Sequence, residues 1–188
     1  ISYRNVTFDT TRLRDGYYNL SVNATTQGTA TNITANVSII IDNTGVNVSL
    51  VTPTNNTNTS ATSISIQVTA NDSLSGLGTV DAQLRSPTGN TGTRQSLSLA
   101  SGTIYSGTWS VTYTLPATDD TYNVTIFAND TALNQKVTNI TTIIVDTTRP
   151  NATTLSPVNS GNASGTITVR AGANDTLTGI VNVPFQFR

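Results

Sequence analysis

The 188-residue sequence contains no cysteine, histidine, methionine or glutamate, and Lys136 is its single lysine. Without cysteine and histidine, the common zinc, copper, haem and iron–sulfur sites lack ligands, and Ser-His or Cys-His catalysis cannot occur. Disulfides are excluded too, so stability must come from a buried core. The adjacent Asp119 and Asp120 point in different directions in an extended chain, which argues against a carboxylate pair of the glycosidase type. We therefore predict that the chain is not an enzyme and carries no cofactor.

Charge and long apolar runs are also scarce. Only 10% of the residues are charged and the net charge is −1, so we expect no nucleic-acid partner and no binding to anionic membranes. No run of 18 apolar residues is present, and we expect no membrane span in this segment. Apolar residues still make up 36% of the chain and alternate with polar ones, which favours a folded protein over a disordered one.

Serine, threonine and asparagine are abundant, at 18, 38 and 21 residues. Alternating apolar and polar positions predict β-strands, and we find no amphipathic helical period, so the expected fold class is all-β. The inward-facing residues should be those that share strand parity: Val46, Val48, Leu50, Ile64, Ile66, Val68, Ala70, Val80, Ala82, Leu84, Leu97, Leu99, Trp109, Val111, Tyr113, Tyr122, Val124, Ile126, Ala128, Val137, Ile143 and Val145.

An internal repeat with a period of about 104 residues organises the chain. Three pairs of segments carry it: 39–53 with 143–157, 63–77 with 165–180, and 15–25 with 119–130. The period suits tandem β-sandwiches of about 100 residues and seven strands. We predict the C-terminal part of one repeat in residues 1–41, a complete repeat in 42–145 and the N-terminal part of the next in 146–188.

Two local motifs refine this prediction. Asp15 and Asp119 each stand three residues before a tyrosine, Tyr18 and Tyr122, that opens an alternating strand. A corner tyrosine of this kind returns its hydroxyl to the backbone a few residues upstream. The joint VDTTRPNATTLSP (145–157) contains two prolines, which predicts a short, stiff connection between neighbouring repeats.

These motifs together resemble the Ig-like repeats of large prokaryotic cell-surface proteins. The resemblance rests on TWSVTY (108–113), DGYYNLSV (15–22), TIFANDTALN (125–134), IIVDTTRP (143–150) and AGANDTLTG (171–179), and it covers essentially the whole chain. It implies tandem Ig-like sandwiches on a cell surface, and the dense Asn-x-Ser/Thr triplets favour an archaeal source. Such repeats occur in adhesins, surface layers, stalks and filaments, so the resemblance implies architecture more than activity.

The Asn-x-Ser/Thr triplet, the acceptor for N-linked glycans, occurs far more often than the roughly six times expected by chance. The acceptors are Asn5, Asn19, Asn23, Asn32, Asn36, Asn47, Asn55, Asn58, Asn71, Asn123, Asn129, Asn139, Asn151, Asn162 and Asn174. Most lie in turns or between inward-facing residues, so we expect them to point to solvent; Asn139 has inward parity and is the weakest candidate. We favour extensive covalent glycosylation over the alternative that these residues are merely a polar exterior.

Aspartates at the joints and turns raise a second possibility, a calcium site. The turns NDSLSG (71–76) and NDTLTG (174–179) start with Asn-Asp, while Asp42, Asp130 and Asp146 lie near unit boundaries. Calcium binding needs several of these carboxylates to converge. We favour the simpler interpretation that the aspartates cap their own turns.

The aromatic residues Tyr105, Trp109 and Tyr113 admit two interpretations, a sugar-binding platform or a core cluster. All three share the parity of Val111, so we place them in the core and expect no exposed aromatic row.

We therefore expect a structural, non-enzymatic, heavily glycosylated segment of an extracellular filament or stalk. Its partners would be neighbouring repeats of the same chain or identical chains arranged head to tail. The partial repeats in 1–41 and 146–188 fit either a longer repetitive polypeptide, which we favour, or chains that complete one another with donated strands. The alternatives are an adhesin or carbohydrate-binding Ig-like module, and a spacer attached to a secreted enzyme.

Overall fold

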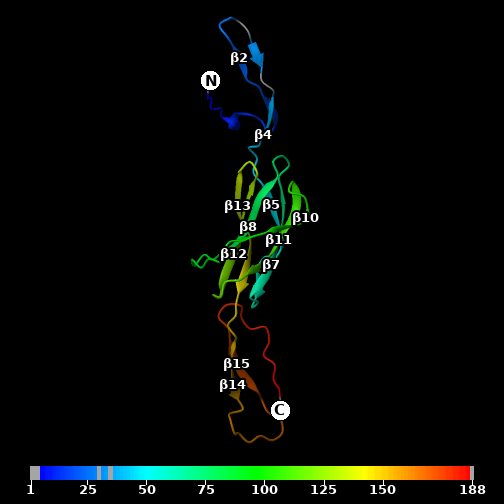
Figure 1. The fold of residues 1–188 in the computed structure, drawn as a ribbon. Coiled ribbons are helices and arrows are strands. Elements are labelled where there is room, and N and C mark those ends of the chain that lie inside the picture. The colour runs from blue at the N-terminus through cyan, green and yellow to red at the C-terminus, as the bar shows by residue number, and fades with distance from the viewer. Residues whose placement is uncertain (1–4, 29–30, 34–35, 187–188) are drawn as a thin grey trace.

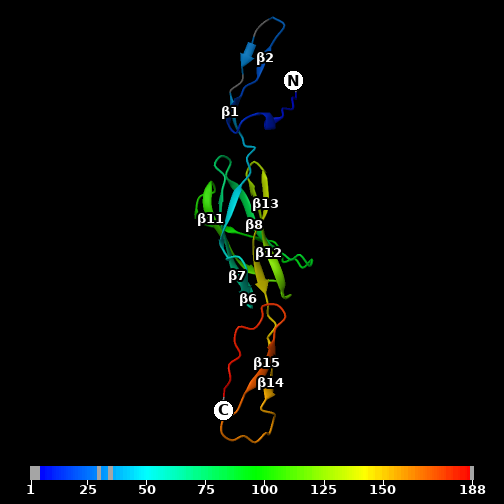
Figure 2. The same ribbon diagram turned by 180° about the vertical axis from the view of Figure 1, so that it is seen from behind.

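The computed structural model describes residues 5–28, 31–33 and 36–186. The described chain is all-β, as predicted, with one short 3₁₀ turn, η1 (Thr10–Arg12), and no α-helix. A central body stands between two thinner β-ribbons, so the molecule is elongated with its two ends far apart (Figures 1 and 2). Within these described ranges, no helix has the length and apolar character needed to cross a membrane.

The central body consists of two β-sheets. The strand order in the four-stranded sheet is β10-β11-β7-β5, and in the five-stranded sheet it is β6-β13-β12-β8-β9. The strands are β5 (Asn47–Thr52), β6 (Thr57–Thr59), β7 (Ser63–Asn71), β8 (Leu77–Arg85), β9 (Gln95–Ser96), β10 (Ser98–Gly102), β11 (Ser106–Thr114), β12 (Asp120–Asp130) and β13 (Gln135–Val145). All pairs are antiparallel except β6 with β13, which is parallel. This arrangement fits a β-sandwich.

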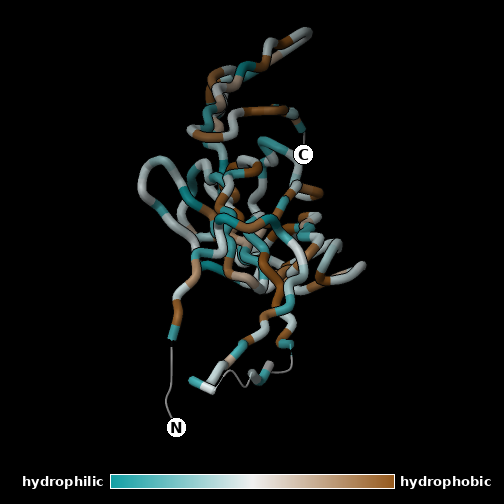
Figure 3. The backbone as a smooth tube through the Cα atoms, turned by 90° about the horizontal axis from the view of Figure 1, so that it is seen from above, coloured by the Kyte–Doolittle hydropathy of each residue, from teal (hydrophilic) through white to brown (hydrophobic). Residues whose placement is uncertain are grey.

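One hydrophobic core lies between the two sheets. Alternation along β7, β8 and β12 directs every second side chain inward, as expected for strands with one buried face. Tyr113 crosses this core: its hydroxyl donates to the carbonyl of Thr93 at 2.6 Å and accepts from the amide of Leu84 at 3.2 Å. Seen along the long axis, apolar and polar stretches alternate along the chain (Figure 3).

The two flanking ribbons are built from short strands. On the N-terminal side, β1 (Gly16–Leu20) pairs with β4 (Val37–Ile41), and β2 (Asn23–Thr25) pairs with β3 (Thr31–Ile33). On the C-terminal side, β14 (Asn151–Ser156) pairs with β15 (Arg170–Asn174). The predicted boundaries 1–41, 42–145 and 146–188 remain predictions, and their outermost residues, 1–4 and 187–188, lie outside the described residues.

Four predicted inward positions are wrong, each for a local reason. Val137 is 56% exposed because β13 contains a β-bulge: Val124 pairs with Thr141 and Thr125 pairs with Asn139, so parity reverses at Ile140. The same bulge turns Asn139 outward, contrary to prediction. Ile140 packs against the core instead.

The other two errors lie near β10. The predicted single strand through Leu97 and Leu99 is two strands, because the chain crosses from β9 in one sheet to β10 in the other. Leu97 is buried at this crossing, whereas Leu99 is exposed. Tyr105 is also exposed, because it lies in the tight turn before β11, where Thr103 donates its amide to Ser106, and strand parity does not extend into that turn.

Candidate functional site

The corner tyrosines adopt the predicted geometry. The hydroxyl of Tyr122 donates to the carbonyl of Thr118 at 2.8 Å, and the hydroxyl of Tyr18 donates to that of Arg14 at the same distance. Each bond reaches back four residues and fixes the entry into a strand, β12 or β1. The predicted structural role of these two tyrosines is therefore confirmed.

Next to each corner tyrosine, an aspartate binds the linker. The linker is the segment that follows β4 or β13 and leads to the next unit. Asp119 accepts hydrogen bonds from the amides and hydroxyls of Thr147 and Thr148. Asp15 accepts from the amide of Asn43 and the hydroxyl of Thr44, 104 residues earlier. The Thr148 hydroxyl, followed by Thr147, lowers the pKa of Asp119 to about 2, because these bonds stabilise the charged carboxylate.

A second aspartate at each joint ties the linker to the following unit. Asp42 accepts from the amides of Thr44 at 3.1 Å and Ser75 at 3.0 Å. Asp146 accepts from the amide of Thr148 at 3.2 Å and from the amide and hydroxyl of Thr178. The linker is thus held on both sides, by the preceding unit and by the following one.

The turns after β7 and β15 are capped by their own aspartates, as predicted. Asp72 accepts from the amides of Leu74, Ser75 and Gly76, and Asp175 accepts from those of Leu177, Thr178 and Gly179. The Leu177 amide is the main reason that the pKa of Asp175 is lowered. These are Asx-type turns.

At the first joint, three carboxylates converge. Asp42, Asp72 and Asp130 are all buried, and their ligand oxygens lie within 4.8 Å of one another. Asp130 accepts from the amide and the Nδ2 of Asn134, each at 2.9 Å. No lysine or arginine forms an ion pair with the three carboxylates within the described part of the chain. Among the described residues, these oxygens are the ones that could hold a cation such as calcium, which takes six to eight oxygen ligands.

The glycan acceptors are spread over the whole described surface. Thirteen of the fifteen acceptor asparagines are exposed, and Asn123 and Asn129, both on β12, are half-buried. Asn139, expected inside, is among the exposed ones because of the β13 bulge. An acceptor must reach solvent to be glycosylated, and this surface placement meets that requirement.

Hydrogen bonding distinguishes the acceptor asparagines from three of the six asparagines outside the triplets. Among the described residues, the asparagines whose Nδ2 donates a hydrogen bond are Asn43, Asn90 and Asn134, and none of these stands in an acceptor triplet. The acceptor Asn19, Asn55, Asn129 and Asn139 engage only their Oδ1. Since the glycan is attached to Nδ2, the acceptors keep free the atom that would react.

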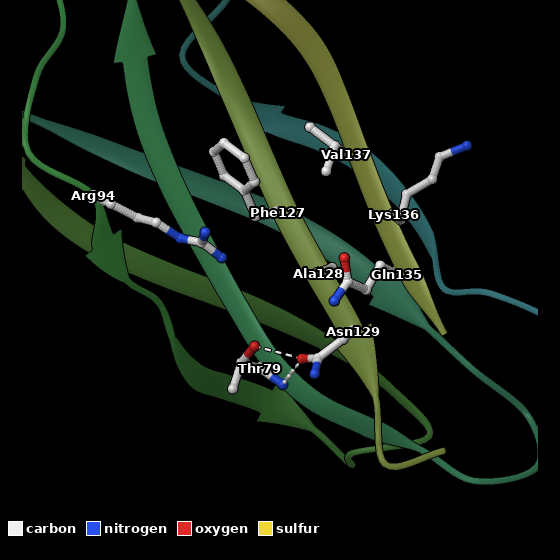
Figure 4. Close-up of a pocket in the computed structure, with 8 residues that line it drawn as sticks. All are labelled: Thr79, Arg94, Phe127, Ala128, Asn129, Gln135, Lys136 and Val137. Atoms are coloured by element: carbon white, nitrogen blue, oxygen red, sulfur yellow. Dashed lines mark hydrogen bonds between the residues drawn. The ribbon is translucent and has the colours of Figure 1, made fainter. Parts of the chain in front are cut away.

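A shallow hollow on the outer face of the five-stranded sheet surrounds Asn129 (Figure 4). The Asn129 Oδ1 accepts from the amide and hydroxyl of Thr79, and the guanidinium of Arg94 lies 4.1 Å from the ring centroid of Phe127. Arg94 also pairs with Asp81 at 2.8 Å. Phe127 was not among the predicted site residues, although its position between the inward-facing Ile126 and Ala128 predicts an outward side chain.

The aromatic and carboxylate candidates are otherwise placed largely as predicted. Trp109 and Tyr113 are buried in the core. Of these three aromatic residues, only Tyr105 is exposed. Asp119 and Asp120 diverge: the first binds the linker and the second accepts from Ser86, Thr88 and Asn90. These bonds, the Thr88 hydroxyl first, lower the pKa of Asp120. The two adjacent carboxylates therefore bind different segments, the linker and the loop of Ser86 to Asn90.

The fold and joints define an all-β protein of the sandwich type with braced connections. A family model described as "Domain of unknown function (DUF7743)" matches residues 55–168, and because this is more than half of the chain, the chain belongs to that family. The matched range runs from the middle sandwich across the Asp146 joint into the C-terminal ribbon. A comparison with curated proteins found no match.

Proposed function

We propose that this chain is a structural, non-enzymatic, heavily N-glycosylated segment of an extracellular filament or stalk, built of stacked Ig-like domains. The proposal rests on the hydrogen bonds that aspartates form at the two joints. The linker is braced by Asp15 and Asp42 at one end of the sandwich and by Asp119 and Asp146 at the other, with equivalent partners. Neighbouring units held by the same bonds would stack with a constant orientation, which is what a fibre requires.

The strand order supports the Ig-like assignment. In Ig domains one sheet contains strands A, B, E and D and the other contains C, F and G. Naming β5 to β13 in chain order as A, A′, B, C, C′, D, E, F and G gives the sheets D-E-B-A and A′-G-F-C-C′. Tyr122 then stands near the start of strand F, the usual place of the corner tyrosine.

The acceptor asparagines support a carbohydrate coat. Their exposure, and the free Nδ2 that distinguishes them from Asn43, Asn90 and Asn134, are what dense glycosylation needs. Glycans would also protect a surface with little charge, because uncharged, threonine-rich strand edges tend to pair with other chains. The proposed extracellular location follows from these glycans.

The alternative of a carbohydrate-binding module receives less support. Such modules present an open aromatic face, whereas Phe127 in the hollow is covered by Arg94, which is itself paired with Asp81. Trp109 lies in the core.

Immunogold electron microscopy on cells of the source organism tests the proposal. Antibodies against the 188-residue chain should label fibres or stalks outside the cell, at repeated intervals along their length. The same antibodies pre-absorbed with the chain are the control. Labelling confined to the cell interior would contradict the proposed function.

A further inference from the structure

Three acceptor triplets of the middle sandwich are joined to one another by hydrogen bonds. They are residues 55–57, 123–125 and 139–141. The hydroxyl of Thr125 donates to the Oδ1 of Asn139 at 2.6 Å, and the hydroxyl of Thr141 donates to the Oδ1 of Asn55 at 3.3 Å. In each bond, the third residue of one triplet binds the acceptor asparagine of another.

Folding buries the two threonines that make these bonds. Thr125 is 1% exposed and Thr141 is 8% exposed. Both lie where β12 and β13 pair, since Thr125 is opposite Asn139 and Thr141 is opposite Val124. Thr141 and Asn55 are 86 residues apart in the sequence, so the bond between them forms only when the sandwich closes.

The acceptor amides of the same triplets remain accessible. Asn55 and Asn139 are exposed, and Asn123 is half-buried. Asn55 and Asn139 are held through Oδ1, which leaves Nδ2 as the atom that can carry a sugar. A glycan that is already attached to Nδ2 is therefore compatible with the folded sandwich.

The transfer of the glycan requires more than an accessible amide. A sugar activated on a lipid-linked phosphate reacts at its C1: the bond from C1 to Nδ2 forms and the bond from C1 to the phosphate oxygen breaks. The lipid phosphate leaves with the electron pair, and Nδ2 loses one proton. Because only serine or threonine completes the triplet, the transferring enzyme must contact that hydroxyl, and a buried hydroxyl prevents the contact.

We propose that Asn123 and Asn139, the closed acceptors, are glycosylated only before the middle sandwich folds, and that the chain then folds with these sugars attached. The inference rests on the proposed N-glycosylation. Asn58 and Asn71, the open acceptors, differ because the third residues of their triplets, Ser60 and Ser73, are exposed. The open acceptors are therefore also accessible to the transferring enzyme after folding.

The test compares the folded 188-residue chain with an unfolded chain of the same length. In the double variant Ile66→Asp/Leu84→Asp, two unpaired charges replace fully buried side chains, which should unfold the middle sandwich. Leu133→Asp introduces the same charge at an exposed position and should leave the chain folded. All three chains are produced without glycans and incubated with a purified N-oligosaccharyltransferase and its lipid-linked donor.

Mass spectrometry of peptides gives the initial rate at each acceptor. The closed acceptors should react at least about 100-fold more slowly in the folded chain and in Leu133→Asp than in the double variant, because opening a core strand requires much of the stability. The open acceptors should differ by less than about tenfold, because exposed segments open at little cost. Comparing each acceptor with itself removes differences between serine and threonine triplets.

Trp109 fluorescence verifies which chains are folded. Closed acceptors that react as fast in the folded chain as in the double variant would overturn the inference. So would closed acceptors that fail to react in the double variant while Asn58 and Asn71 react, because folding would then not be what limits them. Neither outcome contradicts the proposed function, which is tested separately by immunogold labelling on native material.

Discussion

Asp119 accepts two hydrogen bonds from Thr148, one from its amide at 3.0 Å and one from its hydroxyl at 2.5 Å. Asp15 holds the hydroxyl of Thr44 in the corresponding way, also at 2.5 Å. In both places a carboxylate before a corner tyrosine fixes the first residues of a linker. The direction in which each linker leaves is therefore set by side chains of the unit that precedes it.

The Asp119–Thr148 contact should depend on pH. Because the pKa of Asp119 is about 2, below the ordinary value of 3.8, its hydrogen bonds stabilise the joint fully above pH 3.8. This stabilisation is lost as the pH falls from 3.8 to about 2. The amide proton shift of Thr147, which donates to Asp119 at 2.8 Å, should titrate with a midpoint near pH 2 when followed by NMR. The titration should vanish in Asp119→Asn and persist in Asp9→Asn, and a midpoint near 3.8 would contradict the assigned contact.

The corner tyrosine should contribute measurably to stability. Tyr122→Phe removes the hydroxyl that donates to Thr118 and should lower the free energy of unfolding by about 1 kcal/mol. Tyr17→Phe removes the hydroxyl of an exposed tyrosine and should change it by less than about 0.5 kcal/mol. Urea unfolding followed by Trp109 fluorescence measures both. Equal effects would refute the structural role of the corner.

The β13 bulge makes a prediction about two apolar residues. Ile126→Ala creates a cavity in the core and should destabilise the middle sandwich by about 2–5 kcal/mol. Val137→Ala, at a position that simple alternation places inside, should cost less than about 0.5 kcal/mol because the bulge exposes it. The same urea titration applies, and a large loss of stability in Val137→Ala would mean that the strand has no bulge.

The carboxylate triad predicts a response to calcium. Three buried carboxylates within 4.8 Å of one another repel, and a divalent cation relieves that repulsion. Calcium should therefore raise the melting temperature by several degrees over that in a chelator, as expected for about 1 kcal/mol of stabilisation. The rise should disappear in Asp130→Asn and persist in Asp81→Asn. A melting temperature that calcium leaves unchanged would show that the aspartates serve only as turn caps.

Local patterns predicted the features that depend on neighbouring residues. Alternation placed Tyr122, Val124 and Ile126 inside, and the Asn-Asp starts predicted the turn caps, because a strand or turn is decided by adjacent residues. The bulge at Ile140 was not predictable, since it depends on how β13 meets β12. Alternation alone gives no sign of such a shift.

Features that join distant segments were predicted only in part: Asp42, Asp130 and the turn of Asp72 were considered as calcium ligands, but turn caps were favoured and the convergence was not predicted. Asp42, Asp72 and Asp130 converge because the ends of β7 and β12 meet the incoming linker at one pole of the sandwich. Arg94 reaches Phe127 from the loop before β9. Both contacts follow from strand order, which the spacing of residues along the chain does not reveal.

The intact mass of the protein isolated from its natural source shows whether this segment carries a sugar coat. We predict that residues 1–188 carry mass beyond the 19.7 kDa of the sequence, in sugar-sized steps that deglycosylation removes and that map to the acceptor asparagines. A mass for this segment equal to 19.7 kDa, with none of those asparagines modified, would contradict it.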